Sequence, residues 1–260
     1  MTLAHDRRPA APLALAAPLA LAALLALAAL AAACSPDNRP PRAAGTPQAS
    51  APAPLRLPAT FVGDLPCRDC EATRLTLTLF DDATFRTRAV MRGGTGDGRT
   101  TAELGTWRLL DGGRRLVLDG TGASARQFGR IGADTLRLLD NTGAELVAPL
   151  PYRLGRAAAV DTVRDRMRLD GAIVETAEAV RFVDCASGRG FPVLRTGAFA
   201  SLGRGVRQAQ AGQPRPTSAR VIGRLQPRPP ELTGTGEVLV VDSVERVWIG
   251  GACGAGRPRG

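Results

Sequence analysis

The sequence predicts an all-β fold for the part of the chain that follows residue 55. Leucines alternate with threonines from Arg74 to Phe80, which is the period-two pattern of a strand with one buried face. Short turn sequences rich in Asp and Gly separate this strand from several others of similar length. Many short strands at such close spacing predict a small antiparallel β-barrel.

The expected strands follow one another along residues 56–155. After a turn at 81–83, alternation resumes at Phe85, Thr87 and Ala89. A Gly-rich segment at 93–98 is expected to be a flexible hairpin loop, because it lacks the Gly-Lys-Ser/Thr ending of a phosphate loop. The remaining strands are expected at 104–109, 115–118, 135–139 and 150–154, with a hairpin turn at 111–113 joining the first two.

The N-terminus has the features of a bacterial export signal. Arg7 and Arg8 precede residues 10–33, which are almost entirely Ala and Leu. We therefore expect residues 1–33 to be a signal peptide that is removed. The small residues before Cys34 would also suit ordinary signal peptidase, and the apolar run is long enough to remain as an uncleaved membrane anchor.

Cys34 is the candidate lipidation site. Leu30-Ala31-Ala32-Ala33-Cys34 resembles the lipobox of bacterial lipoproteins, although the usual leucine three residues before the cysteine is Ala31 here. This resemblance implies a diacylglycerol on Cys34, and Ser35 in place of Asp implies sorting to the outer membrane. Two or three acyl chains would hold the protein there firmly.

The composition excludes several kinds of site. The single histidine, His5, lies in the signal segment, so a Ser-His-Asp site, a Cys-His site and an imidazole-bound metal are all excluded from the mature chain. We expect no enzymatic activity. The net charge of +10 comes from arginine alone. A cationic surface could bind anionic lipid headgroups or nucleic acid. Because the arginines are scattered along the sequence and aromatic residues are few, we interpret them instead as genomic composition and expect no nucleic-acid partner.

Composition also divides the mature chain. Residues 34–55 are rich in Pro, Ala, Ser and Thr and are expected to be a disordered tether. The β domain at 56–155 would then be followed by a charged, alanine-rich linker at 156–168. A second domain would occupy residues 169–254.

One motif of the first domain carries a family resemblance. The segment from Phe61 to Glu71 contains Leu-Pro-Cys-Arg-Asp-Cys and runs directly into the Leu/Thr strand, and Gly105-Thr106-Trp107 follows later. Together these features resemble the N-terminal domain of the NlpE family, which are envelope-stress and copper-homeostasis lipoproteins. The resemblance extends from Pro58 to Leu154.

The second domain carries a shorter resemblance to the same family. Residues 182–193 resemble a signature of its C-terminal OB-like domain. That resemblance implies an OB-like β-barrel with a short helix at 199–211, strands at 218–225 and 237–241, and a final cysteine at Cys253.

Cys67 and Cys70 could serve in three ways. They could form a disulfide, a two-coordinate Cu(I) site, or half of a zinc site completed by Cys185 and Cys253. An oxidising periplasm favours disulfides. Thioredoxin-like catalysis is disfavoured, because the motif leads into a strand and not into the N-terminus of a helix.

A disulfide between Cys185 and Cys253 would have a larger effect on stability. The two residues are 68 positions apart, so the closed loop would contribute about 4 kcal/mol, which is comparable to the whole stability of a small domain. Its loss could unfold the second domain, and this is a physical basis for a redox or folding sensor. A disulfide with no signalling role is the alternative.

The expected function follows from these features and from the resemblance. The resemblance implies an outer-membrane-anchored, periplasm-facing lipoprotein involved in envelope-stress signalling to an inner-membrane sensor kinase and in copper tolerance. No resident cofactor is expected, and copper is the metal that the resemblance suggests as a candidate. The alternatives are a lipocalin-like carrier, because a calycin-like barrel can hold an apolar ligand in its mouth, and a Cu(I) buffer using Cys67 and Cys70.

Overall fold

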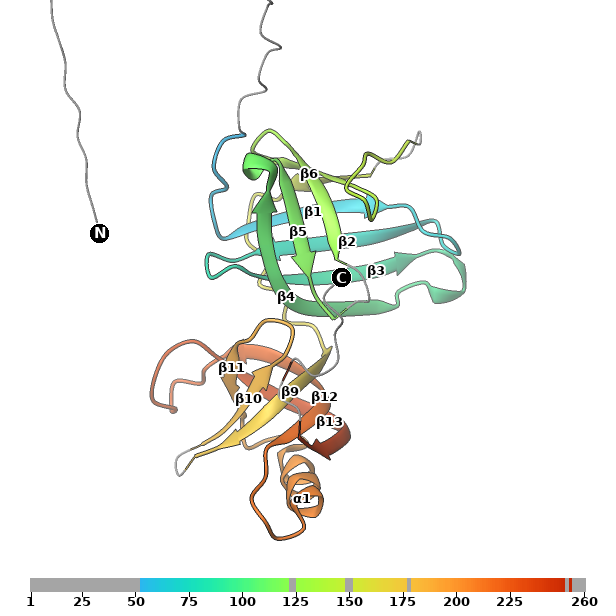
Figure 1. Cartoon of the computed structure of the whole chain (residues 1–260). Helices are drawn as coiled ribbons and strands as arrows, with labels where there is room; N and C mark the ends of the chain where they lie inside the picture. Colours follow the sequence, from blue (N-terminus) through green and yellow to red (C-terminus); the bar gives the residue numbers. More distant parts are fainter. Residues whose placement is uncertain (1–51, 122–124, 148–151, 177–178, 251–252, 254–260) are drawn as a thin grey trace, which may run out of the picture. The chain divides into compact units, whose positions relative to one another are not determined.

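The computed structural model describes residues 52–121, 125–147, 152–176, 179–250 and 253 (Figure 1). The described residues do not include the expected signal peptide or Cys34. Of the expected tether, they include only residues 52–55. Two β-sheets make up most of the described chain, and one helix accompanies the second sheet.

The first sheet is a closed barrel of eight strands in sequence order (Figure 1). Each strand pairs antiparallel with the next, and the ring closes where Phe61 and Val62 face Arg156 and Gly155. The strands are β1 (Ala59–Leu65), β2 (Ala72–Leu79), β3 (Thr84–Arg92), β4 (Thr100–Leu110), β5 (Arg115–Asp119), β6 (Arg126–Ile131), β7 (Thr135–Leu138) and β8 (Arg153–Arg156). This confirms the antiparallel barrel that the period-two pattern predicted.

Large apolar side chains fill the inside of the barrel. Phe61, Phe85 and Phe128 are all fully buried there, together with Leu77 and Leu79 of the alternating strand. Because successive side chains of a strand point to opposite faces, the leucines of β2 pack inside while its threonines point outward.

Close packing where β4 meets β5 requires a glycine at position 105. A Cβ atom at this position would lie 2.3 Å from the carbonyl oxygen of Asp119 and 2.7 Å from the ring of Phe85. Two residues later, the indole N–H of Trp107 donates a hydrogen bond of 3.0 Å to the carbonyl oxygen of Phe80. The Gly-Thr-Trp motif therefore combines a tight strand contact with an anchored aromatic residue.

The segment that follows β8 lies along the outside of the barrel. The backbone N–H of Asp161 donates to the Thr60 hydroxyl at 2.9 Å, and the Thr78 hydroxyl donates to the carbonyl oxygen of Asp161. Val163 is completely buried. Thr60 and Thr78 are therefore buried as well, although the alternating pattern places them on the outer face.

The second sheet has the strand order β11-β10-β9-β12-β13, with all neighbours antiparallel (Figure 1). A parallel bridge between Val193 and Leu239 joins the ends of the sheet, as expected for an OB-like barrel. Its elements are β9 (Met167–Glu175), β10 (Val180–Asp184), β11 (Gly190–Pro192), α1 (Phe199–Gln210), β12 (Thr217–Pro227) and β13 (Glu237–Ile249). The predicted all-β class, with an OB-like second domain and one short helix, is confirmed.

Several details differ from the sequence-based expectations. Strand β6 (Arg126–Ile131) was not predicted, because its residues show no clear alternation. The helix ends at Gln210, and Ala211 caps it in the left-handed region at φ 48°. Strand β13 extends to Ile249, eight residues beyond the predicted end, and β9 begins at Met167.

Two outward-facing side chains of the barrel contact the second sheet. Leu104 of β4 is 1% exposed and belongs to the apolar core that surrounds Leu169 and Leu239. Arg86 of β3 is 2% exposed, and it donates hydrogen bonds to the carbonyl oxygen of Thr162 at 3.0 Å and to the Glu237 carboxylate at 2.9 Å. A buried guanidinium needs such partners, because desolvation penalises an unpaired charge.

A buried carboxylate shapes the turn after β10. Asp184 is 0% exposed, and its Oδ2 accepts hydrogen bonds from the backbone N–H of Ser187 at 2.8 Å and from its hydroxyl at 2.7 Å. Its other carboxylate oxygen has no hydrogen-bond partner. Burial therefore raises the pKa of Asp184, although the hydrogen bonds from Ser187 oppose this effect.

We predict that Asp184→Asn changes the pH dependence of unfolding. Because the pKa of Asp184 is higher in the folded state, its contribution to stability is fully present below the unfolded-state pKa and is lost as pH rises through the folded-state pKa. Asparagine keeps an acceptor oxygen for Ser187 but does not titrate. In urea unfolding from acid to neutral pH, the wild type should therefore lose free energy of unfolding relative to the variant as pH rises.

Asp82→Asn is the matched control with the opposite sign. Burial acts to raise the pKa of Asp82, but hydrogen bonds from Thr84 and the charge of Arg189 hold it below its ordinary value. The wild type should therefore gain stability relative to this variant as pH rises. A pH-independent difference between wild type and Asp184→Asn would show that folding does not raise the pKa of Asp184.

Candidate functional site

The first disulfide lies in the loop between β1 and β2, at one end of the barrel. Cys67 and Cys70 are bonded, with their Cα atoms 5.6 Å apart, and both side chains are half-buried. The Cys70 sulfur lies 3.4 Å from the carbonyl oxygen of Ala72, the first residue of β2. The disulfide therefore fixes the point at which the chain enters this strand.

The loop between β3 and β4 packs against this disulfide loop. Its 3-10 turn, Gly94–Gly96, is followed by Asp97, whose carboxylate accepts a hydrogen bond of 2.8 Å from the backbone N–H of Gly93. A Cβ atom at Gly94 would lie 2.4 Å from the carbonyl oxygen of Asp69, and its φ of 71° also favours glycine. Residues 93–98, which were expected to form a flexible loop, therefore pack closely against the CxxC loop. In the sequence, only the glycines of this segment indicated such close packing.

The second disulfide joins the turn after β10 to the segment after β13. Cys185 and Cys253 are bonded, with their Cα atoms 4.6 Å apart and a sequence separation of 68. The backbone N–H of Cys185 donates to the carbonyl oxygen of Asp170 at 2.8 Å, so β9 also holds this turn. The Asp184 carboxylate organises the same turn from inside the sheet.

The two disulfides differ in what they contribute to stability. In the chain-entropy model the loop closed by Cys67 and Cys70 is worth only about 2 kcal/mol, whereas the loop closed by Cys185 and Cys253 is worth about 4 kcal/mol. The first bond therefore fixes local geometry. The second stabilises the domain as a whole.

The cysteine geometry does not fit a zinc site made from all four sulfurs. Cys67 is bonded to Cys70 and Cys185 to Cys253, so the described cysteines form two separate pairs. Within the described residues, no group of three or more His, Cys, Asp or Glu side chains could hold a metal ion. A closed Cys67–Cys70 bond also offers no thiolate to Cu(I), which is the ligand that this soft ion prefers.

The barrel interior does not favour the carrier alternative. A lipocalin-like carrier needs an empty apolar space inside its barrel. Here the rings of Phe61, Phe85 and Phe128, together with the enclosed leucines, occupy that space.

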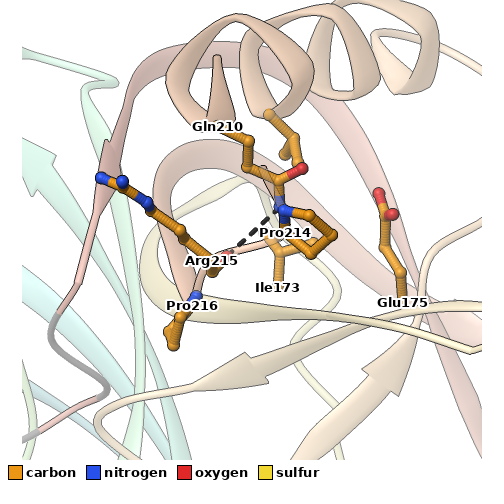
Figure 2. Close-up of a pocket in the computed structure, with 7 residues that line it drawn as sticks. Ile173, Glu175, Gln210, Pro214, Arg215 and Pro216 are labelled. Carbon is orange, nitrogen blue, oxygen red and sulfur yellow. Dashed lines mark hydrogen bonds between the residues drawn. The ribbon is translucent and has the colours of Figure 1, made fainter. Parts of the chain in front are cut away.

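An open pocket of about 480 Å³ lies beside the C-terminal end of α1 (Figure 2). Ile173, Val206 and two prolines provide its apolar lining, and Glu175 contributes a carboxylate. The Gln210 amide donates to the carbonyl oxygen of Arg215 at 3.3 Å, which is the dashed line in Figure 2. This lining contains no thiol, hydroxyl or imidazole nucleophile beside the carboxylate.

Cys34 lies outside the described residues. Of the helices in the described ranges, none combines the length and the apolar character needed to cross a membrane.

Comparisons with known proteins place both domains in one family. The NlpE N-terminal domain model matches residues 61–148, and the NlpE C-terminal OB domain model matches residues 163–254. Lipoprotein NlpE of Escherichia coli (strain K12) is 30% identical over 170 residues, which are 65% of this chain and 69% of that protein.

Two solved structures are also similar. The crystal structure of the Cpx pathway activator NlpE from Escherichia coli is 27% identical, and the match covers 77% of this chain and 98% of that one with a TM-score of 0.32. A putative lipoprotein from Shewanella oneidensis is 27% identical, with 40% and 93% covered and a TM-score of 0.35. On the sequence matches across both domains, this chain belongs to the NlpE lipoprotein family.

Proposed function

We propose that this protein is a non-enzymatic lipoprotein of the bacterial outer membrane that reports damage in the envelope to an inner-membrane sensor kinase. Acyl chains on Cys34 would anchor it, with its two domains facing the periplasm. The family match across both domains carries this proposal, because the Escherichia coli relative is a lipoprotein and is described as the Cpx pathway activator.

The Cys185–Cys253 disulfide supports a sensing role for the second domain. Its contribution of about 4 kcal/mol is comparable to the free energy of unfolding of a small domain. A failure of disulfide formation in the envelope would therefore unfold this domain. The barrel has its own apolar core, and its disulfide contributes only about 2 kcal/mol, so it would remain folded and able to signal even without that bond.

The second part of the proposal is a role in copper tolerance, in which only the reduced protein binds copper. Cys67 and Cys70 are half-buried and three residues apart, so reduction would free two thiols in one short loop. The mature chain contains no histidine and only Met91 and Met167 as methionines, so these thiols are its best soft ligands near the barrel end.

We predict that Cys34→Ala abolishes lipid labelling and releases the protein from the membrane fraction. The reason is that the thiol of Cys34 is the only one placed directly after the apolar N-terminal run. Cells would be labelled with a palmitate analogue and fractionated, with Ser35→Ala as the control that keeps the thiol. Continued membrane attachment of the unlabelled Cys34 variant would indicate an uncleaved helix instead.

We predict that Cys185→Ser raises the output of an envelope-stress reporter several-fold above that of the wild type at equal protein level. Loss of this bond removes the main constraint on the second domain. The Cys67→Ser/Cys70→Ser double variant keeps the larger disulfide and should stay close to the wild type. Equal reporter output from Cys185→Ser and wild type would mean that the bond is structural only.

We predict that the oxidised protein does not bind Cu(I) tightly and that reduction creates the affinity. Competition with a chromogenic Cu(I) chelator would measure this before and after reduction. The Cys67→Ser/Cys70→Ser variant should lose the affinity, whereas Cys185→Ser/Cys253→Ser should keep it. Tight Cu(I) binding by the fully oxidised protein would contradict the assignment to these thiols.

A further inference from the structure

One long stretch of the second domain contains arginine and no acidic residue. Residues 185–230 hold eight arginines and neither Asp nor Glu. Arg220 and Arg224 of this stretch form ion pairs with Asp170 and Asp242, which neighbouring strands supply. Arg189 forms a third ion pair, with Asp82. Whether the other five arginines have acidic partners depends on where the fold places them.

Helix α1 lies in the middle of this stretch and is amphipathic. Leu202 and Val206 are buried on the side that faces the sheet, and Gly205 lies against Val247 of β13. Arg204 and Arg207 are both exposed. Because residues three apart on a helix are neighbours, these two guanidinium groups share the solvent-facing side.

Arg195 before the helix and Arg215 after it are also exposed. We call Arg195, Arg204, Arg207 and Arg215 the cationic helix surface. The fold thus gathers, on α1 and the two segments that flank it, four arginines that are spread over 21 positions of the sequence.

The arginines of the cationic helix surface have only neutral partners among the described residues. Arg204 donates to the Ser201 hydroxyl at 2.9 Å, and Arg215 donates to the Gln213 side chain at 3.2 Å. Arg195 lies 6.0 Å from the centre of the Phe199 ring. Although Glu175 lines the same pocket as Arg215, Figure 2 shows the Arg215 guanidinium directed away from that carboxylate.

We propose that the cationic helix surface binds the anionic phospholipid headgroups of the membrane in which the protein is anchored. Guanidinium groups bind phosphate oxygens through paired hydrogen bonds, and four of them are free of carboxylates here. The exposed residues of the helix are Ala200, Ser201, Arg204, Arg207 and Gln208, so it presents no large apolar side chain that would favour a groove in a protein partner. A layer of phosphate groups requires charge and little shape complementarity.

The short tether makes such binding effective, and this step depends on the proposed lipidation of Cys34. Only 18 positions separate Cys34 from Pro52, where the described chain begins. The composition of residues 34–55 predicts a flexible tether, and a flexible chain of 18 residues has a root-mean-square extension of roughly 20–25 Å. Headgroups would therefore be present at high effective concentration around the folded domains.

The test uses residues 35–260, which carry no acyl chain, so it does not depend on lipidation. Sedimentation with phosphatidylcholine vesicles, with and without phosphatidylglycerol, would measure binding at several salt concentrations. We expect binding only to vesicles that contain phosphatidylglycerol, and weaker binding as salt increases. Each arginine near an anionic surface strengthens binding about fivefold, so Arg204→Gln/Arg207→Gln should weaken it by about 25-fold.

Arg99→Gln/Arg153→Gln is the matched control, because it removes the same charge from two exposed arginines of the barrel. It should weaken binding by no more than a few fold. Equal losses in the two variants would show that net charge alone causes binding, and the proposal would be wrong. It would also be wrong if the protein bound neither kind of vesicle or bound both kinds equally. Binding to polyglutamate without binding to phosphatidylglycerol would likewise contradict it, because that result would indicate an acidic protein partner.

Discussion

The disulfide between Cys185 and Cys253 is the constraint on which the second domain depends. It links the segment after β13, the last strand, to the turn after β10. In the sheet, β9 and β12 lie between β10 and β13. The core of this sheet also contains Leu104, which the barrel contributes. A domain of this size has only a few kcal/mol of stability to lose, so a bond worth about 4 kcal/mol decides whether it is folded.

The barrel is stabilised in a different way. Its eight strands close into a ring, so every strand has two hydrogen-bonded neighbours and large aromatic side chains fill the interior. The disulfide between Cys67 and Cys70 closes only a tight loop at the entrance to β2. We therefore expect the two domains of this chain to respond differently to reduction, which is the property that the proposed sensing role requires.

The sequence predicted the features that depend on local patterns. Alternation in β2 identified the barrel, and the CxxC motif with Gly105 and Trp107 identified the family. It did not predict β6, whose register is set by its neighbours β5 and β7. The buried position of Arg86 was also missed, because its partners Thr162 and Glu237 lie 76 and 151 residues away in the chain. The cationic helix surface was missed as well, because four arginines spread over 21 positions form no visible cluster until α1 is folded.

Hydrogen exchange of the oxidised and the fully reduced protein, followed by mass spectrometry, would show whether the second domain depends on its disulfide. Reduction should remove protection from the amides of β9 to β13, while the amides of β1 to β8 remain protected. If protection is lost evenly over both domains, or is unchanged in the second domain after reduction, the Cys185–Cys253 bond does not hold the second domain folded.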